Sequence, residues 1–135
     1  LGIGMYENDK GPTYSISADS KISVRISCQA ARTIQNPNLG FLIKNEQGVT
    51  LGGFNLHMFG LFPEPLKAGE EYTAEFRFNL PRLERNSYSL HPTLADGFGR
   101  DGIYIDSIEN AYIFRVDHAH EVYGLFRFDT EVALV

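Results

Sequence analysis

Residues 40–55 read Gly-Phe-Leu-Ile-Lys-Asn-Glu-Gln-Gly-Val-Thr-Leu-Gly-Gly-Phe-Asn, and this stretch decides the fold class. Phe41 and Ile43 are separated by one residue, which is the period of a half-buried strand. Asn45 can hydrogen-bond the backbone of a following turn, and Gly48 supplies the positive φ that a tight hairpin needs. The stretch therefore predicts a β-hairpin with Phe41 and Ile43 in the core.

Short strand patterns follow one another along the rest of the chain. The cleanest runs through residues 21–31, where every second residue as far as Cys28 is apolar. Further strands are predicted at residues 13–17, 71–78, 88–94, 103–105, 111–116 and 123–128. Helix is nearly absent, because prolines interrupt the remaining apolar segments. Many short strands separated by turn signals are typical of an antiparallel sandwich or barrel, so we predict one all-β domain over residues 1–135.

Composition excludes several classes of partner. The 135 residues carry a formal net charge of −5, which argues against binding nucleic acid. No apolar run is long enough to cross a bilayer, so we expect no direct membrane insertion. Residues 1–4 lack the features of a signal peptide, and this start looks like the interior of a longer protein. The single cysteine, Cys28, has the phase of the core and predicts a buried, non-catalytic thiol, which suits a reducing compartment.

Two segments contain the residue types of metal sites. Asp96 and Asp101 flank a glycine-rich run, but the other oxygen ligands and the terminal glutamate of a calcium loop are missing. A hairpin loop explains the glycines better. His118 and His120 would share a strand face, yet zinc needs about four ligands and no Cys or His cluster accompanies them. We therefore expect no metal and no cofactor, and His57 is either a loop residue or, if exposed, a ligand contact.

Outward positions on three predicted strands suggest a carbohydrate-binding face. The candidates that would hydrogen-bond sugar hydroxyls are Arg25, Gln29, His91 and Arg115. A sugar site usually adds an aromatic ring, for which Tyr104 is the candidate. If the strands are neighbours, these side chains form one face; otherwise each belongs to an ordinary solvated sheet surface. On the first interpretation, Arg25→Ala or His91→Ala weakens glycan binding without changing the melting temperature.

The sequence contains no convincing catalytic set. Carboxylates are numerous, but most fall in turns or on outward phases, whereas a glycosidase needs two at a defined separation in a cleft. There is no Gly-x-Ser-x-Gly elbow and no Ser/His/Asp arrangement. The phosphate-binding Gly-x-x-x-x-Gly-Lys-[Ser/Thr] loop is also missing, so no ATP hydrolysis is assigned. We expect a domain that is not an enzyme.

Three segments carry a resemblance to a known family. They are Gly40-Phe-Leu-Ile-Lys-Asn-Glu-Gln-Gly-Val through Phe54-Asn55; Lys67-Ala-Gly-Glu-Glu-Tyr-Thr-Ala-Glu-Phe followed by Asn86-Ser-Tyr-Ser-Leu; and Ile105-Asp-Ser-Ile-Glu-Asn-Ala-Tyr-Ile-Phe-Arg-Val followed by Tyr123-Gly-Leu-Phe. In order and spacing they resemble the C-terminal carbohydrate-binding domain of the Wzt ATPase subunit of ABC-type O-antigen polysaccharide exporters. The resemblance covers residues 14–126. One departure is Leu56, where the family often has a hydroxyl residue.

This resemblance implies an immunoglobulin-like antiparallel β-sandwich, with a jelly-roll-like arrangement as the alternative. It implies a cytoplasmic domain from a Gram-negative bacterium that binds undecaprenyl-linked O-polysaccharide, often by its non-reducing terminus. The full-length protein would work with ATPase and membrane subunits of the exporter. Domains of this family tend to form homodimers by exchanging the last strand. The apolar tail at residues 126–135 suits that exchange, or pairs within its own sheet.

Two other functions stay open. One is a structural or adhesive immunoglobulin-like domain that binds no ligand, and the other is a small glycosidase or an accessory domain of a glycan-modifying enzyme. Chemical-shift changes on adding an O-polysaccharide exclude the first, and turnover of a polysaccharide supports the second. The hairpin at residues 40–55 is expected to be framework, with the glycan contacts elsewhere in the chain.

Overall fold

The chain folds as two β-sheets packed face to face. The computed structural model describes residues 1–7, 11–16, 20–117, 121–128 and 130–135. Its strands are β1 (Gly2–Glu7), β2 (Ser15–Ile16), β3 (Lys21–Gln29), β4 (Pro37–Asn45), β5 (Thr50–Asn55), β6 (Glu71–Asn79), β7 (Arg82–Leu83), β8 (Asn86–Asp96), β9 (Ile103–Ser107), β10 (Tyr112–Val116) and β11 (Phe126–Arg127). Two single turns of 3-10 helix, η1 (His57–Phe59) and η2 (Gly99–Asp101), are the helical elements of the described residues. The predicted all-β class is confirmed.

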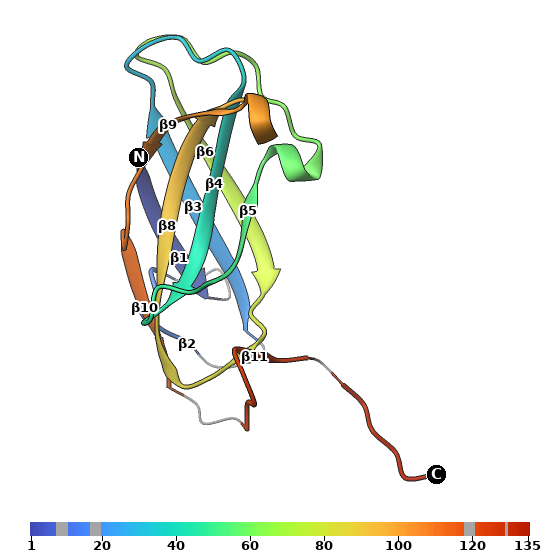
Figure 1. The fold of residues 1–135 in the computed structure, drawn as a ribbon. Coiled ribbons are helices and arrows are strands. Elements are labelled where there is room, and N and C mark those ends of the chain that lie inside the picture. The colour runs from blue at the N-terminus through green and yellow to red at the C-terminus, as the bar shows by residue number, and fades with distance from the viewer. Residues whose placement is uncertain (8–10, 17–19, 118–120, 129) are drawn as a thin grey trace.

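Each layer of the sandwich is one sheet (Figure 1). Sheet A has the order β1-β3-β6 and is antiparallel throughout. Sheet B has the order β2-β10-β8-β4-β5, and β9 also pairs with β8. The short pairing of β2 with β10 is parallel, and the other pairs of sheet B are antiparallel. A small third pair, β7 with β11, lies outside both layers.

The predicted hairpin forms the β4–β5 pair of sheet B. Its turn contains Gly48 with a φ of 78°, and the side chain of Asn45 accepts hydrogen bonds from the backbone N–H groups of Gln47 and Val49, at 3.0 and 2.9 Å. These two contacts are the local reason why the chain reverses here. Both predictions for this turn are confirmed.

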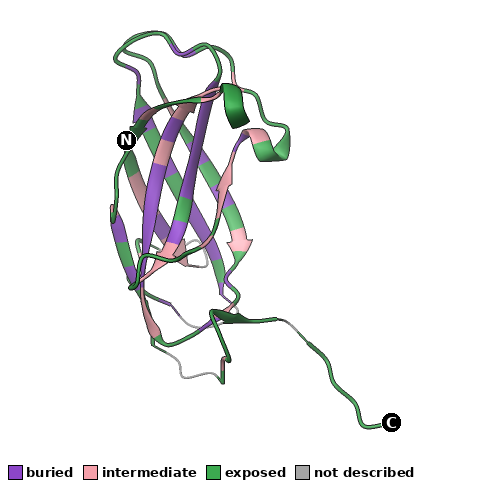
Figure 2. Ribbon diagram, viewed as in Figure 1, coloured by how far each residue is buried: buried purple, intermediate pink, exposed green. Residues whose placement is uncertain are grey.

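The core lies between the two sheets and is rich in aromatic rings. Figure 2 shows the buried residues concentrated on the central strands. Phe41, 1% exposed, points inward from β4, and its ring centroid lies 5.4 Å from that of Phe76 on β6. Ile43 is buried beside it, and Cys28 is buried on β3, as the alternation predicted. Aromatic contact across the layers thus joins sheet B to sheet A.

Several elements differ from the prediction. Strand β1 was not predicted, because its glycines weaken the strand pattern. Two predicted strands shrink to the two-residue β2 and β11. Pro92, which indicated an edge or a bulge, lies in the central strand β8 opposite Phe41. On the side of β8 away from β4, pairing with β10 ends at Leu90 and pairing with β9 begins at Thr93, so Pro92 lies between the two partners, where its missing N–H breaks no ladder. The carbonyl of Pro92 accepts a hydrogen bond from the N–H of Ile108.

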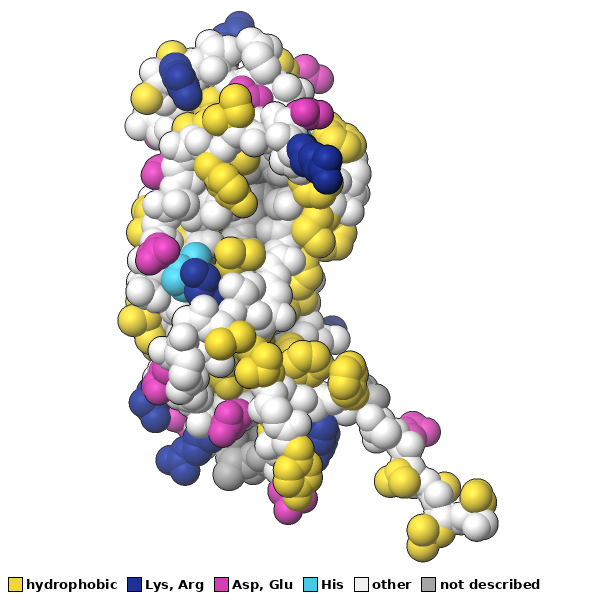
Figure 3. All heavy atoms as spheres, viewed as in Figure 1, with side chains coloured by type: hydrophobic (Ala, Val, Ile, Leu, Met, Phe, Trp, Pro, Cys, Tyr) yellow, Lys and Arg dark blue, Asp and Glu magenta, His cyan; other side chains and the backbone are white. Residues whose placement is uncertain are grey.

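The C-terminal tail leaves the body of the domain. After β11 the chain extends away from both sheets, and hydrophobic side chains are displayed along it (Figure 3). Val132, Leu134 and Val135 are almost fully exposed. The tail was predicted either to exchange with a second copy or to pair within its own sheet. Among the described residues, only β11 of the tail pairs within the domain.

Candidate functional site

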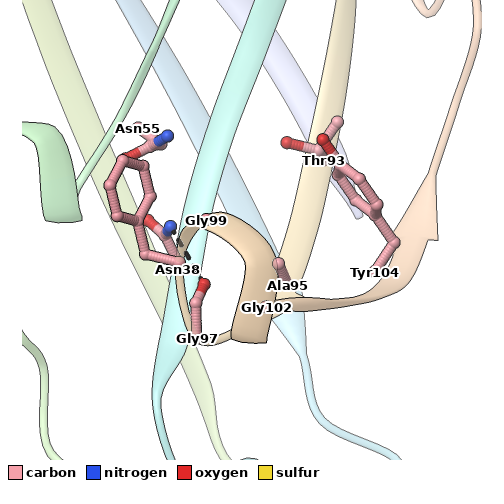
Figure 4. A pocket seen from close by; sticks show the side chains of 9 residues that line it. Asn38, Asn55, Thr93, Ala95, Gly97, Gly99, Gly102 and Tyr104 are labelled. Carbon is pink, nitrogen blue, oxygen red and sulfur yellow. Dashed lines mark hydrogen bonds between the residues drawn. The ribbon is translucent and has the colours of Figure 1, made fainter.

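A groove of about 250 Å³ lies on the outer face of sheet B, at the end where β8 runs into β9. Its lining residues are Asn38, Asn55, Thr93, Ala95, Gly97, Phe98, Gly99, Gly102 and Tyr104. They come from strands β4, β5, β8 and β9 and from the loop that joins β8 to β9 (Figure 4). A concave site built mainly from sheet positions is well suited to hold a ligand in a fixed orientation.

A glycine lies at the centre of one cross-strand row, between two of the lining residues, and we call its bare backbone the floor of the groove. Gly40 on β4 pairs with Thr93 on one side and with Asn55 on the other. A Cβ atom at Gly40 would lie 2.5 Å from the carbonyl oxygen of Phe54, so a side chain does not fit there. The row therefore presents the hydroxyl of Thr93 and the amide of Asn55 on either side of bare backbone.

Two aromatic rings border this floor from opposite sides. Tyr104, on β9, is 77% exposed, and its ring reaches toward Thr93 (Figure 4). Phe98 is 56% exposed, and its ring centroid lies 6.2 Å from that of His57. His57 is two residues after the last residue of β5. Since β9 and β5 flank the β8–β4 pair, the two rings face the groove from its two sides. Ring faces separated by polar groups can contact the C–H face of a sugar while its hydroxyls are hydrogen-bonded.

One buried side chain, Asn38, holds both walls of the groove. Asn38 is only 5% exposed; its Oδ1 accepts the N–H of His57 at 3.2 Å, and its Nδ2 donates to the carbonyl of Gly97 at 3.3 Å. The loop also closes on itself, since Gly97 N–H donates to Asn36 and Gly102 N–H donates to Gly99. Asn38 thus ties both sides of the groove to β4. Asn55 differs, because only its Oδ1 is used, by Met58 N–H, which leaves Nδ2 to the groove.

The five predicted site residues do not form one face. Arg25 and Gln29 lie on β3 in sheet A, whereas His91, Arg115 and Tyr104 lie in sheet B. Their outer faces point away from each other, because the sheets pack through their inner faces (Figure 1). The premise that the three strands are neighbours is correct for β8 and β10 and wrong for β3.

Arg25 is engaged within sheet A. Its Nε donates to the Glu75 carboxylate at 3.0 Å, and its guanidinium lies 4.6 Å from the ring centroid of Tyr6. Hydrogen bonds from Ser23 and Arg25 lower the pKa of Glu75 to about 2, so the carboxylate stays charged at neutral pH. Gln29 is exposed at the end of β3. These residues form a solvated polar face on the side of the domain opposite the groove.

His91 points outward, as its phase predicted, but it is not accessible. The side chain is 6% exposed because the turn before β10 covers it, and its Nδ1 accepts the N–H of Asn110 at 3.2 Å. The other ring nitrogen, Nε2, lies 2.8 Å from the hydroxyl of Ser89. Burial, together with the nearby Lys44, lowers the pKa of His91 and keeps the ring neutral. His91 is therefore a structural residue, and the prediction of an exposed face there was wrong.

Arg115 and Tyr104 lie at opposite ends of sheet B. Arg115 contacts Asp117 and the hydroxyl of Ser87, at 3.4 Å each, near the start of β8. The groove begins at Thr93, six residues further along that strand, or about 20 Å away at 3.3 Å per residue. Tyr104 is thus the one predicted residue that the structure places in the groove.

Comparison with known proteins gives the family. A family model described as the Wzt C-terminal domain matches residues 1–128. The chain belongs to the Wzt C-terminal domain family. The fold agrees with a solved structure described as the crystal structure of the C-terminal domain of wzt: the TM-score is 0.87 at 16% identity, over 98% of this chain and 81% of that one. No curated protein matches the sequence. Membership in this family is consistent with a carbohydrate-binding role in O-antigen export.

Two solved enzymes share part of the architecture of this Wzt C-terminal domain. A β-glucuronidase from glycoside hydrolase family 2 aligns with a TM-score of 0.53 and 17% identity, over 81% of this chain and 11% of that chain. A Bacteroides uniformis β-glucuronidase aligns with a TM-score of 0.50 and 18% identity, over 79% and 12%. At these identities the likeness shows a common β-sandwich fold and nothing about activity.

The described residues contain no group of three or more His, Cys, Asp or Glu side chains able to hold a metal ion. Asp96 binds the backbone N–H groups of Gln35 and Asn36, at 3.3 and 2.8 Å, which explains its place beside the glycine-rich loop. His118 and His120 lie outside the described residues. His57 is half-buried, with its ring 4.8 Å from that of Phe62.

Sequence reasoning missed most of the groove of this Wzt C-terminal domain. Phe98 stands between two glycines in a loop assigned a purely structural role, and Asn55 closes the hairpin that was treated as framework. Asn38 lies on an outward phase just before that hairpin. A usable signal was Gly40, because a glycine inside an otherwise apolar strand often marks a close approach of another group to the backbone.

A second concave surface follows the open edge of the sandwich between β5 and β6. Two adjoining grooves of about 220 and 440 Å³ share Phe54 and Phe78, and their linings are mostly apolar. The lower groove also contains Phe126, at the point where the tail begins. Figure 3 shows hydrophobic side chains gathered along this edge. Among the described strands, β5 has a partner on one side only, so this edge is open to another chain.

No helix within the described ranges is both long and apolar enough to span a membrane.

Proposed function

We propose that this domain binds O-antigen polysaccharide without cleaving it, and thereby selects the substrate for export by an ABC transporter. The observation that carries the proposal is the groove on sheet B, where Tyr104 and Phe98 border a floor of bare backbone beside Thr93 and Asn55. A sugar ring packed against the aromatic faces would have its hydroxyls within reach of a side-chain hydroxyl and an amide donor.

The residue types in the groove support the proposal of binding without turnover. All nine lining residues are described, and none of them is a carboxylate, whereas glycosidases use a pair of Asp or Glu side chains. The groove volume of about 250 Å³ is also below the range of about 300–1,000 Å³ that encloses drug-sized ligands. A site of this size holds one sugar residue, and we assign it to the non-reducing terminus of the chain.

We further propose that the full-length protein works at the cytoplasmic face of the inner membrane with ATPase and membrane subunits, and that the domain is a homodimer there. The support for a dimer is the match between an exposed apolar tail and an open apolar edge. The tail at residues 130–135 would supply a strand to the edge strand β5 of the other copy. Two copies would raise weak single-site affinity for a polymer through avidity.

The test is a titration of the isotopically labelled domain with purified O-polysaccharides, followed by backbone chemical shifts. We expect shifts at Thr93, Asn55 and the loop of residues 97–102. Tyr104→Ala should weaken binding roughly 2- to 12-fold, as expected if an aromatic contact contributes about 0.5–1.5 kcal/mol. Tyr123→Ala is the matched control, because Tyr123 is 93% exposed and does not line the groove.

Three results would contradict the proposal. A domain that shows no shifts with any O-polysaccharide is a structural or adhesive module. Turnover of the polysaccharide would make it part of a glycan-modifying enzyme. Binding that is weakened by Arg25→Ala but not by Tyr104→Ala would place the glycan on sheet A.

A further inference from the structure

Among the residues that the structure describes, no charged side chain lines the groove on sheet B. Its nine lining residues offer amide, hydroxyl, aromatic and glycine groups, and none is Lys, Arg, His, Asp or Glu. This is unusual for the surface of a chain in which 21% of the residues are charged. A ligand in the groove would therefore contact only uncharged side chains and backbone.

Charges close to the groove in sequence offer an anion no net attraction. Asp96 precedes the loop, and its carboxylate is held by two backbone N–H groups. Arg100 and Asp101 are adjacent, exposed residues of η2 and carry opposite charges. Asp106, on β9 with Tyr104, adds a further negative charge, and the chain as a whole carries −5.

Two backbone donors of the loop are already used within the domain, so they do not converge on a ligand. Glycine-rich loops bind phosphate through several N–H groups that converge on it. Here Gly97 N–H is donated to Asn36, and Gly102 N–H is donated to Gly99. Nδ2 of Asn38, a residue only 5% exposed, donates to the carbonyl of Gly97. A phosphate, sulfate or carboxylate in the groove would lose its hydration without a countercharge, which is costly.

We propose that the groove accepts an uncharged sugar residue and rejects one that carries a phosphate, sulfate or carboxylate group. This inference rests on the proposed function and narrows its ligand to neutral glycans. A neutral ring needs only the contacts that the groove provides: the faces of Tyr104 and Phe98, the hydroxyl of Thr93 and the free amide group of Asn55.

The experiment compares glycans that differ only in charge. The domain is titrated at low salt with a neutral O-polysaccharide and with the same polymer after its terminal primary hydroxyls have been oxidised to carboxylates. The expected result is that the neutral polymer shifts groove resonances and that the oxidised polymer binds at least 10-fold more weakly. Ala95→Lys, which places a cation in the groove, should lower the ratio of neutral to oxidised polymer affinity, whatever it does to the affinity for the neutral polymer. If Ala95→Lys does not fold, Thr93→Lys is the second variant; it also removes the Thr93 hydroxyl, so it too is judged by the ratio of the two affinities.

The outcomes separate the two proposals. Equal or tighter binding of the oxidised polymer at the same resonances overturns this inference while glycan binding stands. If that binding is lost in Arg100→Gln, then Arg100 supplies the countercharge and the inference is likewise overturned. No shift with either polymer, in the parent or in the lysine variants, overturns the proposed function itself.

Discussion

Replacing Gly40 by alanine tests the structure of the groove floor most directly. The added Cβ would lie 2.5 Å from the backbone oxygen of Phe54 and 2.7 Å from Cβ of Asn55, so strands β4 and β5 must move apart. Overpacking of this kind costs about 1–3 kcal/mol, and the lower entropy of the unfolded chain offsets about 0.4–1 kcal/mol of it. We expect a net loss of about 1–2 kcal/mol in the free energy of unfolding.

Gly52→Ala is the matched control on the neighbouring strand. A Cβ at Gly52 meets nothing within 4 Å, and its φ is not positive, so this variant should be unchanged or more stable by about 0.4–1 kcal/mol. At about 4 °C per kcal/mol for a domain of this size, the two melting temperatures should differ by about 4–12 °C. Calorimetry or urea titration measures both. Equal melting of Gly40→Ala and Gly52→Ala would refute the close approach at Gly40, and with it the floor of the groove.

Three further predictions address the core, the loop anchor and the buried histidine. Phe41→Ala should lower the free energy of unfolding by about 3–5 kcal/mol in urea titration, because a buried aromatic ring is lost; Phe41→Leu should cost less. Asn38→Ala should cost about 1–3 kcal/mol and speed amide exchange at His57, whose N–H loses its acceptor; unchanged exchange would contradict the anchoring role. Burial lowers the pKa of His91 from 6.5, so stability present above pH 6.5 should fall as the pH drops below it, and this part of the pH dependence should vanish in His91→Gln.

The sequence predicted those features that depend on local periodicity. Alternation on the strand that became β3 identified its buried face, and the Asn45–Gly48 pattern identified the hairpin turn. Both signals work because neighbouring residues alone determine which way a strand side chain points and where the chain can reverse. Strand β1 was not predicted because glycines, not polar side chains, alternate with Ile3 and Met5 at its start.

The site was harder to predict, because periodicity gives the face of a strand but not the sheet to which the strand belongs. Arg25 and His91 are both outward, yet pairing partners far apart in the chain place them on opposite sides of the domain. Exposure is a separate question, since a turn near Asn110 covers His91. Tyr104 was found because it was chosen as an aromatic ring near polar residues, which is the chemistry that the groove does present.

The loop of residues 97–102 is attached to the sandwich in a way that bears on how such domains diversify. Its hydrogen bonds run to its own glycines, to Asn36 and to Asn38, and none of its residues belongs to the hydrophobic core. A segment with this arrangement can be exchanged as a unit while the sheets beneath it keep their packing. If the groove binds glycan as we propose, exchanging these six residues would change part of its lining while the sheets stay folded, so loop grafting would be a route to altered ligand preference.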